Sequence, residues 1–320
     1  MQSIQENLTK LVTDGLNLSV AELLRYQQLT RLMDLTPKRT PQARLAGSYL
    51  TRHKGRGMEF DEARHYQAGD DIRAIDWRVT ARTGKTHTKI YREERERPVF
   101  ILCDLSPSMQ FGTRLLTKAV QAAHLTSLIS WSAATRGDKV GALLFSSGKH
   151  RECKPLSRKR AVLNICHELI TLQQHSINAQ ADEQAQTAAF TDVCARARRL
   201  ARPGSLVYLI SDFQHLSEAS QQHISQLSRH CEVNAVEITD PMEHALPDTS
   251  IVQPVNVTDG HAQQTWMLGD KQEMAAYRQW REQQESAIAA AFSRSRVSHH
   301  HVSAGLSLDD QLLELHRGLR

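Results

Sequence analysis

Residues 98–112 of this 320-residue chain read PVFILCDLSPSMQFG. The unbroken apolar run VFILC is typical of a strand that is covered on both faces, as in a parallel sheet. Residues 206–210 (LVYLI) form a second such run, and residues 140–145 and 232–238 are further predicted strands. Helical patterns lie between these segments, the clearest of them over residues 113–135. Strands that alternate with helices predict a doubly wound, mostly parallel α/β sheet.

The rest of the chain is predicted to extend this fold. We expect a helical segment over residues 1–40, an Arg- and Asp-rich segment with short strands over 41–96, and the main domain over 97–320. The first two segments would form an N-terminal α+β extension. Several prolines predict an irregular insertion or hairpin at about 240–268.

Composition and charge argue against several classes of protein. With 40% hydrophobic and 23% charged residues, the chain is typical of a globular protein. The net charge of +5 comes from scattered basic stretches (44–56, 151–160 and 196–202), which does not favour nucleic-acid binding. No apolar run reaches the roughly 18 residues of a membrane span, and no secretory signal is recognisable, so we expect a cytoplasmic protein. The five cysteines form no CxxC pair and are expected to be reduced.

Polar side chains follow two of the predicted strands at the point where each strand ends. Asp104, Ser106 and Ser108 come directly after the first apolar strand, and Asp212 follows the second. Ligands of open α/β sheets bind at the carboxyl ends of the strands, and carboxylate and hydroxyl oxygens suit Mg²⁺. We therefore predict a divalent-cation site with an open position for a carboxylate of a partner protein. The alternative is that Asp104 and Ser106 only cap the next helix.

This pattern resembles the metal-ion-dependent adhesion site (MIDAS) of von Willebrand factor A domains. The resemblance implies a von Willebrand A or Rossmann-like sheet and Mg²⁺ as the ion, with Mn²⁺ or Ca²⁺ as alternatives. The family also uses a threonine from a loop before a later helix. Thr187 is the first choice for that role in this sequence, and Thr191 is the second.

A second resemblance covers roughly residues 40–320. Its landmarks are Glu59-Phe60, Arg64-x-Tyr66, Gly69-Asp70-Asp71-x-Arg73-x-Ile75-Asp76-Trp77, Thr80-Ala81-Arg82 and Asp240-Pro241-Met242-Glu243. They resemble the MoxR-associated von Willebrand A-like proteins of domain-of-unknown-function family fifty-eight. The resemblance implies a noncatalytic adaptor that partners a MoxR-type AAA+ ATPase in the remodelling or maturation of client proteins, whose identity the sequence does not give.

The Arg- and Asp-rich signature is predicted to be mainly structural. Arg–carboxylate pairs have a specific geometry and can hold a loop-rich segment in place, and Trp77 is expected to anchor it in apolar surface. A docking surface for the ATPase is the second interpretation, and catalysis by Asp70 or Asp76 with His65 is the third. The signature residues are Arg64, Tyr66, Asp70, Asp71, Arg73, Asp76, Trp77 and Arg82.

Other interpretations remain open. A metal-dependent hydrolase or phosphotransferase would use Asp104 as nucleophile, although Ser106 stands where such enzymes carry a second aspartate. The sequence also has no GxxxxGK[ST] phosphate loop. Nucleic-acid binding through the basic stretches ranks last. The run His299-His300-His301 lies in a predicted strand, where neighbours face opposite sides, so its three imidazoles are not expected to bind one ion.

Overall fold

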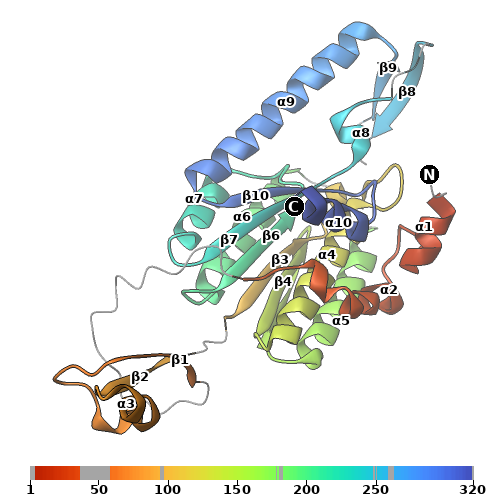
Figure 1. The fold of residues 1–320 in the computed structure, drawn as a ribbon. Helices are drawn as coiled ribbons and strands as arrows, with labels where there is room; N and C mark the ends of the chain where they lie inside the picture. The colour runs from red at the N-terminus through yellow and green to blue at the C-terminus, as the bar shows by residue number, and fades with distance from the viewer. Residues whose placement is uncertain are drawn as a thin grey trace. The chain divides into compact units, whose positions relative to one another are not determined.

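The computed structural model (Figure 1) describes residues 4–36, 58–93, 97–177, 179, 183–247, 249, 251–258 and 263–318. The chain forms two compact units, one of residues 1–39 together with 97–320 and the other of residues 40–96. The basic stretch at 44–56 lies outside the described residues, and Glu59 and Phe60 are described by their backbone alone.

The main unit is built around a six-stranded sheet in the order β10-β7-β6-β3-β4-β5. The strands are β3 (Val99–Asp104), β4 (Val140–Ser146), β5 (Lys149–Leu156), β6 (Leu206–Ser211), β7 (Glu232–Thr239) and β10 (Ser298–Ser303). Neighbouring strands are parallel except β5, which runs antiparallel to β4. Every residue of β3, β4 and β6 is buried. The predicted α/β fold with a mostly parallel sheet is confirmed.

At the centre of this sheet, the connections that follow β3 and β6 lead to opposite faces. β4 pairs with one side of β3, and β6 pairs with the other side. Helix α4 (Lys118–Arg136), which follows β3, packs on one face, whereas α7 (Glu218–Leu227), which follows β6, packs on the opposite face. From adjacent strand ends, the chain thus leaves β3 and β6 toward opposite faces of the sheet. Open α/β sheets bind ligands at the strand ends where the chain divides in this way.

Helices cover both faces of the sheet. α4 and α5 (Lys159–Ser176) contribute to the core on one face, and α6 (Glu183–Leu200), α7 and α9 (Lys271–Arg294) contribute to the core on the other. α4 is buried along almost its whole length, as its apolar composition predicts. A helix of this kind needs neighbours on every side.

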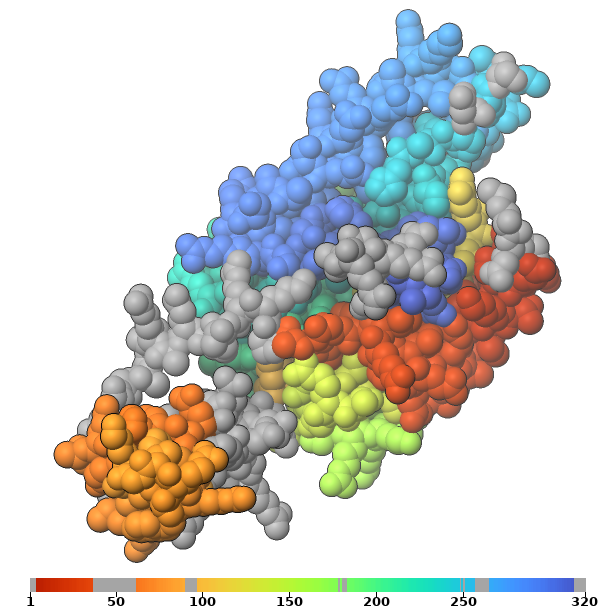
Figure 2. Space-filling view, viewed as in Figure 1, coloured from red at the N-terminus to blue at the C-terminus, as the bar shows by residue number. Residues whose placement is uncertain are grey.

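The N-terminal segment supplies the cover on the outer side of α4. It contains α1 (Ile4–Leu11), α2 (Val20–Arg25) and the 3₁₀ turns η1 (Tyr26–Gln28) and η2 (Thr30–Leu32). Ser127 Oγ and Trp131 Nε1 of α4 donate to the Leu23 carbonyl at 2.7 and 3.3 Å. Figure 2 shows this segment in red against the yellow-green surface of the helical layer. The N-terminal residues thus complete the core of the main unit.

The predicted insertion after β7 contains helix α8 (Pro241–His244) and an antiparallel hairpin of β8 (Gln253–Thr258) and β9 (Gln263–Leu268). α9 follows the hairpin and places Phe292 in the core. β10 then forms the edge of the sheet beside β7, and α10 (Leu308–Gly318) is the last described element. Within the described ranges, no helix combines the length and apolar character needed to span a bilayer. The cysteines are free and buried.

The smaller unit consists of a hairpin and two short helices. β1 (Met58–His65) pairs antiparallel with β2 (His87–Glu93), with a bulge between Phe60 and Glu62. η3 (Ile72–Ala74) and α3 (Trp77–Thr83) lie between the two strands in sequence. Gly84 ends α3 with a φ of 70°, a conformation that glycine adopts without steric cost.

Candidate functional site

The residues after β3 form the first part of the site. Asp104, at the end of β3, is buried, and its Oδ1 accepts the Ser106 backbone N–H at 2.9 Å. Its Oδ2 accepts the Ser211 hydroxyl from the end of β6 at 2.6 Å. The Ser106 and Ser108 hydroxyls lie 3.2 Å apart. Ser108 also bonds Asp212, which follows β6. Four of the predicted site residues therefore meet Ser211 at the carboxyl ends of β3 and β6, namely Asp104, Ser106, Ser108 and Asp212.

The backbone after β6 turns sharply at this point. Phe213, directly after Asp212, has a φ of 54° although it is not a glycine. Its N–H donates to Ser211 Oγ at 3.1 Å, and its ring is buried between Phe190 and Phe292. A bulky residue in the left-handed region is unusual and strained. This strained conformation turns the loop that carries Asp212.

A buried lysine completes the group. Lys118, the first residue of α4, has no exposed side-chain surface, and its Nζ donates to Asp212 Oδ2 at 2.9 Å and to Glu243 Oε1 at 2.5 Å. A cation at a helix N-terminus opposes the helix dipole, so these two carboxylates must hold it there. We call the six residues that meet here the carboxyl-end cluster: Asp104, Ser106, Ser108, Lys118, Asp212 and Glu243.

The capping geometry of α8 positions Glu243. Asp240 caps α8 by accepting the Met242 N–H at 2.8 Å, and Glu243 Oε2 accepts the Asp240 N–H at 2.9 Å in a capping box. Thr113, from the loop before α4, donates its N–H to Asp240 Oδ2 at 2.8 Å. The sequence Asp240-Pro241-Met242-Glu243 therefore serves to present one oxygen of Glu243 to Lys118.

The charges of the cluster do not cancel. Burial, and then the negative charge of Asp212, raise the pKa of Asp104 to about 6. Burial alone would also raise the pKa of Asp212, but the charge and hydrogen bond of Lys118, together with the bonds from Gln214 and Ser108, outweigh burial and lower the pKa. Burial would lower the pKa of Lys118, but Asp212 and Glu243 outweigh it, the pKa is raised and the ammonium stays charged. One ammonium therefore faces three carboxylates, and the negative excess is concentrated at Asp104 and Asp212.

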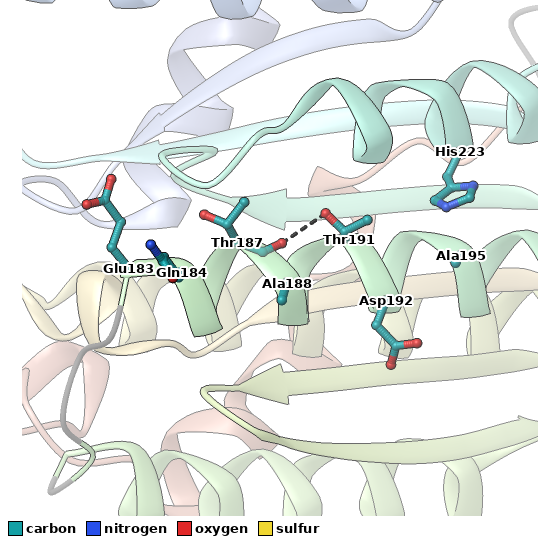
Figure 3. A pocket seen from close by; sticks show the side chains of 8 residues that line it. All are labelled: Glu183, Gln184, Thr187, Ala188, Thr191, Asp192, Ala195 and His223. Carbon is teal, nitrogen blue, oxygen red and sulfur yellow. Dashed lines mark hydrogen bonds between the residues drawn. The ribbon is translucent and has the colours of Figure 1, made fainter.

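Thr187 lies in a different environment. It is on α6 and lines a pocket of about 780 Å³ between α6 and α7, together with Thr191 and His223 (Figure 3). Its carbonyl accepts the Thr191 hydroxyl at 2.9 Å. In the described part of the chain, no hydrogen bond joins Thr187 to Asp104, Ser106, Ser108 or Asp212. A ligand role for Thr187 stays a prediction that this geometry does not support.

Within the part of the smaller unit that the structure describes, the Arg- and Asp-rich signature forms one ion pair and two helix caps. Arg64 donates to Asp70 Oδ1 at 2.7 Å, and the Tyr66 hydroxyl bonds the Asp70 carbonyl at 3.3 Å. The Asp70 carboxylate also accepts the Gln67 N–H, and first this bond and then Arg64 lower its pKa. Asp71 caps η3 and Asp76 caps α3. These roles agree with the structural interpretation of the signature.

Three signature residues do not make the apolar contact or the Arg–carboxylate pairs that the sequence predicts. Trp77 is 67% exposed, so the expectation that it anchors the segment in apolar surface is wrong for the described residues. It occupies the first position of α3, where the Asp76 cap and not packing fixes the backbone. Arg73 and Arg82 are exposed, and no carboxylate among the described residues pairs with them.

Two residues of the carboxyl-end cluster were not anticipated. Lys118 and Glu243 lie 125 positions apart in sequence, and no local pattern pairs them. The sequence nevertheless indicated a role for Lys118, because Lys118 and the last residue, Arg136, are the charged side chains of this apolar helix. A charge inside a buried helix indicates a buried partner.

Comparison with known sequences agrees with the second resemblance. A family described as "Protein of unknown function DUF58" matches residues 62–290. The chain belongs to the DUF58 family. Uncharacterized proteins of Mycobacterium bovis (Mb1516) and Mycobacterium tuberculosis (Rv1480) are each 31% identical to it over 222 residues, which cover 69% of this chain and 68% of each relative. The match includes the whole carboxyl-end cluster and ends before β10.

Proposed function

We propose that this DUF58 protein is a noncatalytic adaptor that binds partner proteins at the carboxyl-end cluster with the help of a divalent cation. The observation that carries the proposal is the unbalanced charge of the cluster. Asp104, Asp212 and Glu243 share one ammonium, which leaves two negative charges when all three carboxylates are ionised. A single divalent ion balances that excess.

The donor set fits Mg²⁺ in kind. Asp104, Ser106, Ser108 and Asp212 would hold the ion, since all four offer hard oxygen atoms. Lys118 would stay on Glu243 and act as a fixed second cation. Ser108 and Glu243 are only partly buried, so the cluster has access to solvent. The bound ion would supply an open position for a carboxylate of the partner.

Asp104 is poorly placed for the alternative role of a nucleophile. Both of its oxygens accept hydrogen bonds, and the side chain is almost fully buried. A substrate would have to reach Asp104 for nucleophilic attack, whereas each carboxylate oxygen keeps a further lone pair with which it could bind a small ion. Turnover of a phosphoester that Asp104→Asn abolishes would favour a hydrolase or phosphotransferase instead.

The partner in this proposal is a MoxR-type AAA+ ATPase in the cytoplasm, with the client protein as the third component. The support is the resemblance of the carboxyl-end motif to a von Willebrand A metal site and of the 59–82 signature to MoxR-associated proteins. The adaptor would present a client to the ATPase, and the Mg²⁺ site is one of two candidate contact surfaces. The signature residues of the smaller unit form the other.

A pull-down with the full chain tests the proposal. The wild-type chain should retain the ATPase or a client when Mg²⁺ is added after chelation, and Asp104→Asn should lose this Mg²⁺-dependent part. Asp192→Asn is the matched control, because Asp192 is half-exposed and, among the described residues, forms its ion pair with Arg196 alone. Equal retention by all three proteins, with and without Mg²⁺, would contradict the metal-dependent adaptor.

A further inference from the structure

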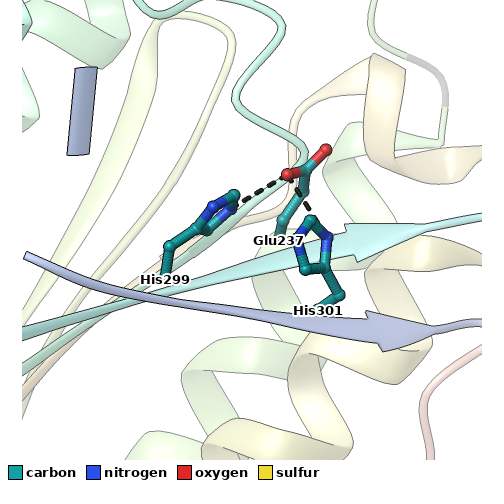
Figure 4. Close-up of side chains that lie close together, drawn as sticks. All are labelled: Glu237, His299 and His301. Atoms are coloured by element: carbon teal, nitrogen blue, oxygen red, sulfur yellow. Dashed lines mark hydrogen bonds and ion pairs between the residues drawn. The ribbon is translucent and has the colours of Figure 1, made fainter. Parts of the chain in front are cut away.

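A second group of metal-binding side chains lies on the edge strand β10 and its neighbour β7. His301 is in register with Glu237 across the parallel pair, and His299 is two residues before His301 on the same face of β10. Figure 4 shows the two imidazoles directed at one carboxylate oxygen. We call Glu237, His299 and His301 the edge-strand group.

Two separations in this group are close to those of a tetrahedral metal site. His299 Nε2 lies 3.0 Å and His301 Nδ1 lies 3.6 Å from the same Glu237 Oε2. Ligands about 2.0–2.1 Å from a tetrahedral Zn²⁺ ion are about 3.3 Å from one another. One ligand atom from each of the three residues lies within 4.8 Å of the other two, so the three side chains are near enough to one another to surround an ion.

The two oxygens of Glu237 have different partners. Oε1 accepts Arg281 Nη2 from α9 at 3.2 Å, whereas Oε2 faces the imidazoles. Arg281 is itself held by Glu285, whose Oε1 accepts Arg281 Nε at 3.0 Å. Ligating carboxylates usually have such an outer partner, which orients the other oxygen toward the metal.

The surroundings close the group on one side and open it on the other. The His299 ring lies 5.0 Å from the Phe292 ring and 6.3 Å from the Phe213 ring, and the Glu237 side chain is fully buried. The His301 side chain is 54% exposed. An ion would thus have an apolar wall behind it and a path from solvent.

We propose that Glu237, His299 and His301 bind one Zn²⁺ ion, with a water molecule as the fourth ligand. Two imidazoles and one carboxylate suit Zn²⁺ better than Mg²⁺, which prefers oxygen ligands. The group is separate from the carboxyl-end cluster, and the family match at residues 62–290 includes only Glu237 of the three. The proposed Zn²⁺ site is therefore independent of the proposed adaptor function.

Titration of the metal-free full chain with Zn²⁺, and with Co²⁺ as a spectroscopic probe, tests the site. The wild-type chain should bind one Zn²⁺, and Co²⁺ should give the visible absorption of a tetrahedral site without a thiolate charge-transfer band, which excludes the cysteines. His301→Ala should weaken Zn²⁺ binding by more than roughly 100-fold, since the loss of an outer partner alone costs about 10–100-fold. His301 is the best residue to change, because its exposure lets the fold survive.

His300→Ala is the matched control. His300 stands between the two ligands but faces the other side of β10, so its removal should leave Zn²⁺ affinity unchanged. Thermal melting in EDTA would verify that each variant is folded. An equal loss in His300→Ala, which would indicate a simple histidine tract, or the absence of stoichiometric Zn²⁺ binding would overturn the proposal. Asp104→Asn should still bind Zn²⁺, so failure of this site and failure of the adaptor proposal are distinguishable.

Discussion

The carboxyl-end cluster and the edge-strand group balance buried carboxylates in different ways. In the cluster, the Lys118 ammonium is fixed between Asp212 and Glu243. In the edge-strand group, Arg281 binds only one oxygen of Glu237, and imidazoles face the other. Each site thus has one permanent cation, and the proposed metal ion would be the second. The donors that remain, hydroxyls and carboxylates in one site and imidazoles in the other, decide which ion each should select.

The largest effect is expected from removing the fixed cation of the carboxyl-end cluster. Lys118→Met should lower the free energy of unfolding by about 3–5 kcal/mol in EDTA, because it leaves buried carboxylates without a partner. Mg²⁺ should recover more stability in this variant than in the wild type, since its negative excess is larger. Urea denaturation with and without Mg²⁺ measures both effects.

Lys10→Met provides the control for that experiment. Lys10 is half-exposed and lies 3.9 Å from Asp310, and exposed pairs of this kind contribute at most about 1 kcal/mol. A Lys118→Met variant that is as stable as Lys10→Met would mean that the ammonium does not balance the cluster.

The next effect is a pH dependence that comes from Asp104. Because its pKa is raised from 3.8 to about 6, the folded state holds this proton more tightly than the unfolded state. The stability that it contributes is present below pH 4 and is lost as the pH rises to about 6. At about 1.4 kcal/mol per pKa unit, the loss amounts to roughly 3 kcal/mol.

Asp104→Asn isolates this contribution. The asparagine can still accept the Ser106 N–H, and Ser211 can accept from its amide. The difference in unfolding free energy between the wild type and Asp104→Asn, measured in EDTA from pH 4 to pH 7, should therefore decline with rising pH. A difference that is flat over this range would show that the pKa of Asp104 is not raised.

A smaller effect is expected where Thr113 positions Asp240. Thr113→Val removes the hydroxyl donor but keeps the backbone bond to Asp240. It should cost about 1.5–3 kcal/mol, which is typical of one hydrogen bond to a charged group. Chemical denaturation measures the cost, and a larger loss of Mg²⁺ binding than of stability would show that α8 controls the cluster.

The smallest effect is expected when a mutation in one site is tested for its influence on metal affinity at the other. Asp104 and His299 share no hydrogen-bond partner in the described residues, and separate sites are additive within about 0.5 kcal/mol. Asp104→Asn should therefore change Zn²⁺ affinity less than about threefold, and His301→Ala should change Mg²⁺ affinity equally little. Calorimetric titrations of both variants with both ions would reveal any coupling.

The sequence predicted those parts of the molecule in which local pattern determines structure. The apolar runs at 99–103 and 206–210 became β3 and β6, because such runs need cover on both faces. Asp104, Ser106, Ser108 and Asp212 came together because each follows one of these parallel strands. Position at a strand end is enough to place a residue at the edge of the sheet.

Contacts between distant elements were not predictable in this way. Lys118 bonds Glu243, which α8 carries to it. His299 lies beside Glu237 because of the pairing of β10 with β7, whose register the sequence does not predict. The expectation that the histidine run does not bind one ion stays a prediction for its three members together, and it did not consider a ligand from β7. Trp77 was expected to anchor the segment in apolar surface because of its apolar ring, although the Asp76 helix cap fixes its backbone.

An anomalous-scattering map from crystals of the full chain soaked in Mn²⁺ would show whether the carboxyl-end cluster holds a divalent cation, since Mn²⁺ takes the same oxygen ligands as Mg²⁺. We expect a peak bonded to Asp104 and Asp212, with Lys118 still on Glu243. A map without a peak there, in which Lys118 bridges Asp212 and Glu243 as described above, would overturn the metal-dependent adaptor.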